Sequence, residues 1–195
     1  MNICIFGAAS SKIDESYIKA VENLSEQLAQ RGHSLVFGAG NNGLMGAAAR
    51  GFHKGKGKVA GIVPYFFRTD YVEELYEECD EFIYTDTMAQ RKAKMEDMAD
   101  AFIIAPGGIG TFEEFFEVYV LRQLNRHNKA LAIFDVNNYY RPMEALLEHA
   151  MKENFLNENC MKLYKRFDED QVDALISYVE GRQERPDSVS EVKLG

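Results

Sequence analysis

The stretch that decides the fold is PGGIGTFEE, at residues 106–114. The apolar run AFIIA, at 101–105, precedes it, and a segment with apolar residues at helical spacing follows it. This order predicts a strand, a glycine turn and a helix. Glycines let the backbone approach a ligand closely, and the first N–H groups of a helix point at whatever lies there. The stretch therefore predicts an anion site, with phosphate as the expected ligand. It is not a Walker loop, because no Gly-Lys-Ser/Thr follows.

Glu114 has two interpretations. A carboxylate is a poor neighbour for an anion if phosphate binding is the only task of the turn. Thr111 and Glu114 also have the spacing of a capping box, in which two side chains satisfy the first helical N–H groups. A role in chemistry and a role in capping can coexist, and the spacing leaves both open.

The composition is that of an ordinary globular protein, with 195 residues, 46% of them hydrophobic and 27% charged. A net charge of −9 argues against a nucleic-acid partner, although a glycine nest can still bind a small anion. The three cysteines form no CxxC pair, which favours a reducing compartment. No targeting segment and no apolar run of membrane-spanning length are visible. We therefore expect a cytoplasmic protein without a membrane partner.

Predicted strands and helices alternate along the chain. This pattern predicts an α/β protein of Rossmann-like type, with an open, mainly parallel sheet and helices on both faces. We expect one domain over residues 1–181, and a disordered tail over 182–195, which are polar and without pattern. Ligands of such sheets lie beyond the carboxyl ends of the strands, where the glycine-bearing turns at 7–11, 38–43 and 106–110 would converge.

The turn GAGNNG, at 38–43, matches the dinucleotide-binding pattern G-x-G-x-x-G. That interpretation also requires an acidic residue about twenty positions later, at the end of the next strand. The next predicted strand, 58–63, runs into PYF with no carboxylate. The sequence therefore does not support binding of NAD at this turn. The glycines still allow a close approach of the backbone to a ligand or to a neighbouring helix.

Other segments are less informative. A predicted helix over 87–99 carries Arg91 and Lys92 near its start, which indicates either a nearby anion or ordinary surface charge. The acidic, aromatic segment 65–80 suggests no chemistry. Residues 139–142, YYRP, open a helix predicted to run to about residue 154. The four histidines lack metal-ligand spacing, so no metal site is expected.

Three motifs together resemble the Lonely Guy family of cytokinin riboside 5′-monophosphate phosphoribohydrolases, often misnamed lysine decarboxylases. They are PGGxGTxxE at 106–114, MxxRKAxM at 88–95 and GLMG at 43–46, and the resemblance covers about residues 1–180. Two places depart from the family pattern. The family usually has three glycines where this chain has Gly38-Ala39-Gly40, and Gly-Ser-Ser where it has GAAS at 7–10.

The resemblance implies a reaction and a site. The reaction is hydrolysis of the N-glycosidic bond of a nucleoside 5′-monophosphate, which gives the free base and ribose 5-phosphate without a cofactor. The resemblance implies that Arg91 and Glu114 are catalytic and that further residues bind the substrate. These are Met88, Lys92, Gly107, Gly108, Gly110 and Thr111, with Lys92 and the backbone N–H groups of the turn on the phosphate.

Other functions remain as alternatives. Some relatives with this fold carry molybdenum cofactor without cleaving a nucleotide, and they would need the phosphate cradle but no carboxylate. A pyridoxal phosphate decarboxylase is disfavoured, because no context for a Schiff-base lysine is visible. Adenosine monophosphate is the cautious choice of substrate, and an N6-prenylated derivative would require an apolar pocket. The family implies a homodimer, which the wide apolar surface of the helix over 112–124 suits; a central helix packed on both sides would look the same.

Overall fold

The computed structural model describes residues 1–70 and 73–183. Within them, seven parallel strands form one sheet in the order β4-β3-β2-β1-β5-β6-β7. The strands are β1 (Asn2–Phe6), β2 (Ser34–Phe37), β3 (Val59–Pro64), β4 (Glu81–Thr85), β5 (Ala101–Ile104), β6 (Ala130–Asp135) and β7 (Lys165–Asp168). The predicted α/β class and parallel sheet are confirmed. Most of the expected tail, residues 184–195, lies outside the described residues.

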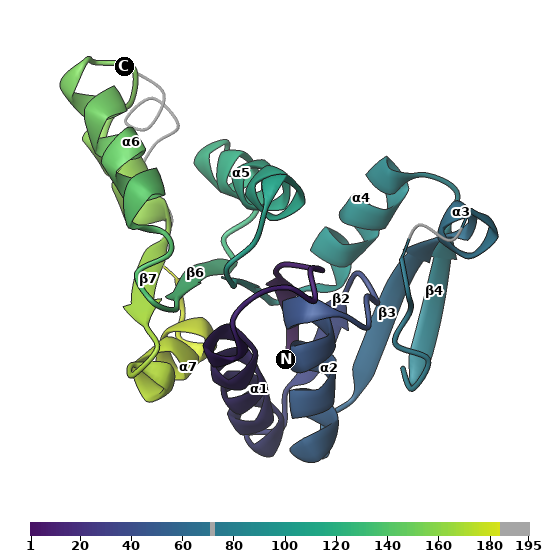
Figure 1. Cartoon of the computed structure of the whole chain (residues 1–195). Coiled ribbons are helices and arrows are strands. Elements are labelled where there is room, and N and C mark those ends of the chain that lie inside the picture. Colours follow the sequence, from purple (N-terminus) through teal and green to yellow (C-terminus); the bar gives the residue numbers. More distant parts are fainter. Residues whose placement is uncertain (71–72, 184–195) are drawn as a thin grey trace.

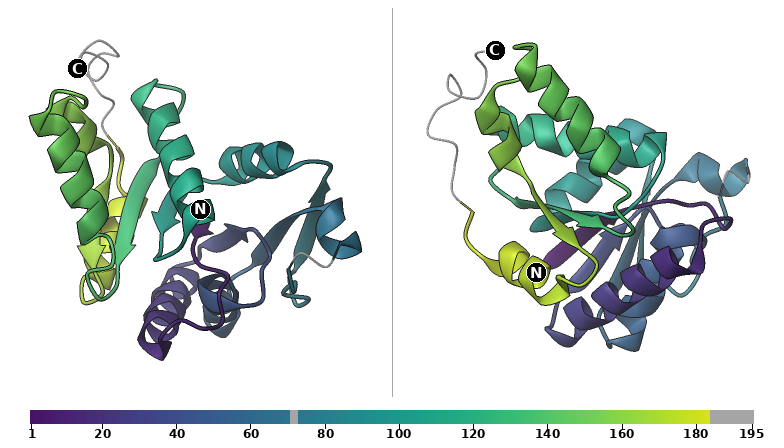
Figure 2. Two further views of the ribbon diagram at one scale, coloured as in Figure 1. Left: turned by 45° about the horizontal axis from the view of Figure 1, so that its top comes forward. Right: turned by 60° about the vertical axis from the view of Figure 1, so that its left-hand side comes forward.

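Helices cover both faces of the sheet, as predicted (Figure 1). Those on one face are α1 (Glu15–Gln30), α2 (Gly43–Lys54) and α7 (Val172–Glu180). Those on the other are α4 (Met88–Met98), α5 (Ile109–Gln123), α6 (Arg141–Lys152) and the short 3-10 helix η1 (Glu158–Leu163). The short helix α3 (Tyr65–Thr69) follows β3. The two views of Figure 2 show α1 and α2 side by side, away from α4 and α5.

The alternation of side chains along β1 explains the two cores. Ile3 and Ile5 pack with α1 and α2, whereas Cys4 and Phe6 pack with residues of α4 and α5. Both sets are buried, as expected for a parallel strand with helices on either side. The helices are therefore held by apolar contacts on two faces, and the strand ends are left free to build a site.

The strand order creates a crevice. From β1 the chain runs outward through β2 and β3 to β4, and it then returns to β5, which lies on the other side of β1. Turns that leave β1 and β5 therefore diverge to opposite faces, which opens a crevice at the carboxyl ends of these strands. The glycine turns after β1 and β5 both begin there. Across the described residues, no helix is long and apolar enough to cross a membrane.

Candidate active site

A cavity of about 380 Å³ lies at the crevice beside β1 and β5. It gathers six of the eight residues expected in the site, which are Met88, Arg91, Gly108, Gly110, Thr111 and Glu114. The turn after β5 and the first turns of α5 supply one wall, and α4 supplies another. Residues that are far apart in the sequence therefore meet in one place.

Hydrogen bonds between backbones lock the glycine turns together. The N–H of Ala8 donates to the carbonyl of Pro106 at 3.0 Å, and the carbonyl of Ala8 accepts from the N–H of Leu44 at 2.7 Å. Gly43 has a φ of +58°, and a Cβ there would lie 2.3 Å from the oxygen of Ala8. Only glycine adopts this backbone freely and leaves room for the neighbouring turn.

Arg91 is buried in the cavity wall, with 6% of its surface exposed. Its guanidinium lies directly on the backbone of Gly38, where an added Cβ would be 1.6 Å from Nη2. The guanidinium carbon also lies 5.3 Å from the centre of the Phe67 ring, and Nη1 lies 3.7 Å from the sulfur of Met88. Its buried Nε has no partner in the described part of the chain. The glycine at 38 is therefore explained by the arginine side chain that packs on it.

Glu114 is the partly buried carboxyl of the cavity. Burial raises its pKa to about 7, and the positive charge of Arg91 opposes that rise. A group with this pKa can be ionised or protonated near neutral pH, which suits proton transfer or stabilisation of positive charge. The capping interpretation of Thr111 and Glu114 is wrong. Helix α5 begins at Ile109 with Gly108 as its N-cap, and no side chain caps it.

The start of α5 presents a group of unpaired backbone N–H groups. In the described part of the chain, no hydrogen bond is formed by the N–H groups of Gly107, Gly108, Ile109 or Gly110. The first N–H groups of a helix lack helical partners, and together they carry a partial positive charge. Thr111 packs on this turn, and its Oγ1 lies 2.1 Å from where a Cβ on Gly107 would be, so position 107 has no room for a side chain.

Lys92 and Gly107 do not line this cavity. The ammonium of Lys92 pairs with Glu113 and with Glu117, the latter at 2.7 Å. It thus ties α4 to α5 beside the cavity. Gly107 lies against Thr111 and lines a smaller, mainly apolar cavity of about 260 Å³ on the other side of Gly108.

Glu73 is a cavity residue that the sequence did not indicate. Its Oε1 is buried without a partner in the described residues, and burial raises its pKa. Two backbone bonds of 2.8 Å hold its segment over the second glycine turn, from Asn41 N–H to the oxygen of Glu74 and from Tyr76 N–H to that of Ala39. The acidic segment has no helical or strand period, so the sequence held no signal for this placement. Ser10, Met45 and Glu113 also line the cavity.

The raised pKa of Glu114 predicts a pH-dependent stability. Between about pH 4.5, the ordinary value, and pH 7 the folded protein holds a proton that the unfolded chain releases. The folded state therefore loses stability as pH rises through this range, and the loss is complete above about pH 7. Glu114→Gln should stabilise the protein by about 2–3 kcal/mol at about pH 8 and by little at about pH 4.5.

Urea unfolding at the two pH values checks this prediction. Glu148→Gln is the control, because Glu148 is exposed on α6. An equal effect of Glu114→Gln at both pH values would show that the carboxyl titrates in the folded protein as it does in water.

Comparisons with known proteins identify the family to which this chain belongs. The sequence model of a family described as "Possible lysine decarboxylase" matches residues 45–178. A cytokinin riboside 5′-monophosphate phosphoribohydrolase of Arabidopsis thaliana is 37% identical over 161 residues, which cover 83% of this chain and 75% of that protein. An enzyme of the same name from Rhodococcoides fascians is 36% identical over 155 residues, 80% of this chain and 78% of that protein.

Solved structures show the same fold. The molybdenum cofactor carrier protein of Chlamydomonas reinhardtii has a TM-score of 0.68 at 17% identity, covering 92% of this chain and 97% of that one. The molybdenum cofactor binding protein of Rippkaea orientalis has a TM-score of 0.63 at 18% identity, covering 92% and 96%. Identity this low shows the fold alone. The sequence relatives show more: the chain belongs to the Lonely Guy family, whose sequence model carries the description of possible lysine decarboxylase.

Proposed function

We propose that the protein hydrolyses the N-glycosidic bond of a purine nucleoside 5′-monophosphate, releasing the base and ribose 5-phosphate. One observation carries the proposal. Arg91 and Glu114 line the same cavity as Gly108 and Gly110, which lie at the start of α5. An anion site beside a tunable carboxyl fits a phosphorylated sugar. The names of the relatives, which are phosphoribohydrolases, supply the class of reaction.

The phosphate of the substrate takes its place at the start of α5. The N–H groups of Gly108, Ile109 and Gly110 donate to it, and the helix dipole favours its charge. These donors come from the backbone, so a protein with a net charge of −9 can bind an anion locally. Lys92 is held by two glutamates, and we assign it to fixing α4 against α5 and not to the phosphate.

The chemistry follows from the two charged side chains. As the bond between C1′ of the ribose and the base breaks, positive charge develops on the sugar ring. The carboxylate of Glu114 stabilises that charge and takes a proton from the attacking water, whose oxygen bonds to C1′. The base leaves with the bonding electrons and takes a proton from solvent, and Glu114 returns to solvent the proton that it took from the water. Arg91 binds ribose hydroxyls and keeps part of Glu114 ionised, because its charge lowers the pKa of the carboxyl.

The base occupies the wall formed by Met45 and Met88, whose thioethers adapt to a flat ring. Adenine and an N6-prenylated adenine are the two candidates, and the relatives' names favour a cytokinin base. The alternative is a non-hydrolytic carrier of a nucleotide-like cofactor. Its support is likeness of fold to carrier proteins at 17–18% identity. Such a carrier has no use for the partly buried carboxyl of Glu114.

Release of base is the direct test of this function. We expect wild-type protein to release adenine from adenosine monophosphate, or isopentenyladenine from its prenylated derivative, as measured by chromatography. Glu114→Gln keeps the shape of the side chain but cannot become ionised. It should lower kcat by at least about 100-fold, in line with the loss of a group that acts in the transition state.

Glu148→Gln on α6 is the matched control and should retain wild-type rates. The ratio of the two wild-type rates gives the base preference. A folded wild-type protein that binds both nucleotides and cleaves neither would contradict the hydrolase, and the carrier function would replace it.

Gly38→Ala tests whether activity depends on the packing of the Arg91 guanidinium against Gly38. The new methyl would overlap the guanidinium, which is the end of a flexible side chain and can move while the fold persists. We expect kcat/KM to fall by at least about 100-fold with a small change in thermal midpoint, because a displaced guanidinium no longer meets the ribose. If the effect runs through Arg91, Gly38→Ala should add little to Arg91→Ala in the double variant. Full additivity of the two effects on kcat/KM would show that Gly38 affects activity by a route other than Arg91.

We also propose that the protein is a cytoplasmic homodimer. Ile109, Phe116 and Val120 form an exposed apolar stripe on α5, and its opposite face, with Phe115 and Val118, is already buried in the core. A stripe of this kind is typical of a subunit contact. Light scattering should give twice the chain mass for wild type and one chain mass for Phe116→Glu. A monomeric wild type at micromolar concentration would contradict the dimer.

A further inference from the structure

Two neighbouring tyrosines reach the glycine turn from the segment between β6 and α6. The hydroxyl of Tyr139 donates to the carbonyl of Gly107 at 2.6 Å, and that of Tyr140 donates to the carbonyl of Ala105 at 2.8 Å. Both bonds span more than thirty residues of sequence. They attach the anion-binding turn to a part of the sheet that supplies no residue of the larger cavity.

The bond from Tyr139 sets the direction of one donor. The carbonyl of Gly107 and the N–H of Gly108 belong to the same trans peptide, in which they point in opposite directions. Holding the carbonyl toward Tyr139 therefore turns the N–H of Gly108 away from it. Of these two cavities, Tyr139 lines the smaller, apolar one, whereas Gly108 borders both. This N–H donates no hydrogen bond within the described residues, so it is available to an anion.

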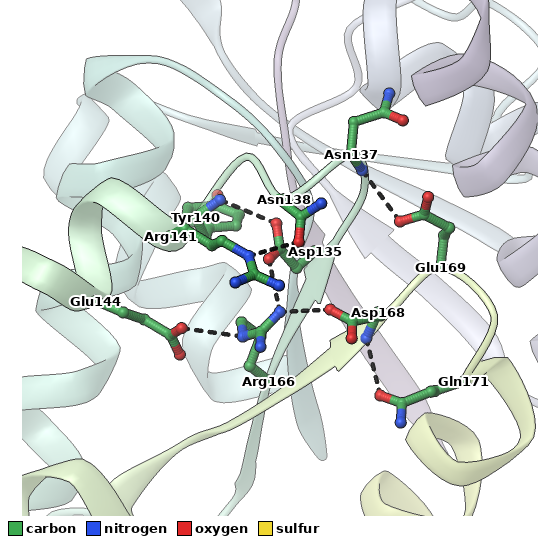
Figure 3. Close-up of polar contacts among 10 residues, drawn as sticks. All are labelled: Asp135, Asn137, Asn138, Tyr140, Arg141, Glu144, Arg166, Asp168, Glu169 and Gln171. Atoms are coloured by element: carbon green, nitrogen blue, oxygen red, sulfur yellow. Dashed lines mark hydrogen bonds and ion pairs between the residues drawn. The ribbon is translucent and has the colours of Figure 1, made fainter.

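A network around the buried Asp135 holds the backbone at Tyr140 in place (Figure 3). The N–H of Tyr140 donates to Oδ1 of Asp135 at 2.9 Å, and Nη1 of Arg166 donates to Oδ2 of the same carboxylate at 2.8 Å. Nε of Arg166 also pairs with Glu144 at 3.0 Å. Asp135 is fully buried, and a buried charge of this kind is stable only when paired and hydrogen-bonded. The network therefore fixes the backbone from which both hydroxyls extend.

The turn before the tyrosines has a constrained backbone. Asn137 and Asn138 have φ values of +54° and +57°, a conformation that asparagine adopts more readily than most residues. The N–H of Asn137 donates to Glu169 at 3.0 Å. The ring of Tyr139 packs edge-on against Tyr17, at 6.3 Å between centres. Both its backbone and its ring are thus constrained, so the hydroxyl is held at one point.

We propose that Tyr139 is a positioning residue for the phosphate of the substrate. Its hydroxyl holds the Gly107–Gly108 peptide in the orientation that aims the N–H of Gly108 at the anion. Tyr140 secures the end of β5 behind it and is more deeply buried, with 1% of its surface exposed against 38% for Tyr139. This inference rests on the proposed function, because it assigns a task within the same phosphate site.

Tyr139→Phe tests the role, since it removes one oxygen and leaves the ring. The dissociation constants of ribose 5-phosphate and of adenine are measured by calorimetry, with kcat and KM for adenosine monophosphate measured alongside. Affinity for ribose 5-phosphate should fall about 5- to 10-fold, the effect of one hydrogen bond. KM should rise by a similar factor and kcat should change less than about 2-fold. Adenine, which has no phosphate, should bind as before, and the thermal midpoint should stay close to that of wild type.

Tyr17→Phe is the matched control, because Tyr17 shares the wall of the smaller cavity and its hydroxyl forms no hydrogen bond with the glycine turn in the described residues. It should leave the affinity for ribose 5-phosphate unchanged. Equal weakening of ribose 5-phosphate and adenine in Tyr139→Phe would overturn the role in positioning, and so would unchanged affinity for ribose 5-phosphate. A wild-type protein that does not bind ribose 5-phosphate would instead overturn the phosphate site itself.

Discussion

The site depends on the two hydrogen bonds of Ala8. Its N–H holds the turn after β5 and its carbonyl holds the first residues of α2, so one residue connects all three glycine turns. Because β1 lies at the centre of the sheet, between β2 and β5, this residue stands where the strand order reverses. The turns are therefore fixed relative to one another before any ligand binds. Preorganisation of this kind lets backbone donors act on an anion without further ordering.

Loss of contact with water gives Glu114 its raised pKa. Glu114 would be an ordinary surface carboxyl on an exposed helix, but in the cavity its pKa is raised to about 7 while Arg91 opposes that rise. Arg91 can take this position because Gly38 has no side chain and leaves the space that the guanidinium fills. The proposed phosphate site and the carboxyl of Glu114 lie on the same helix, α5, near its start. In the proposed function, a single rigid element therefore fixes the distance between the bound phosphate and the reacting carboxyl.

Local patterns in the sequence predicted most of the fold. The strand, glycine turn and helix around residues 106–114 could be recognised because an apolar run, glycines and helical spacing follow one another directly. The pairing of Arg91 with Glu114 required the resemblance to a family, since nothing local relates α4 to α5. Glu73 and Tyr139 were missed because their roles arise from long-range packing. Glu73 lies in a segment without a period, and Tyr139 was interpreted only as the opening of a helix. The predicted capping box of Thr111 and Glu114 was wrong because α5 begins earlier, at Ile109.

A crystal structure of the Glu114→Gln protein with adenosine monophosphate tests the central claim most directly. The account predicts the phosphate within hydrogen-bond distance of the N–H groups of Gly108 and Gly110, and the ribose between Arg91 and residue 114. C1′ should face the side chain at 114, with the base against Met45 and Met88. A nucleotide bound with its phosphate away from the start of α5, or with C1′ remote from residue 114, would contradict the account.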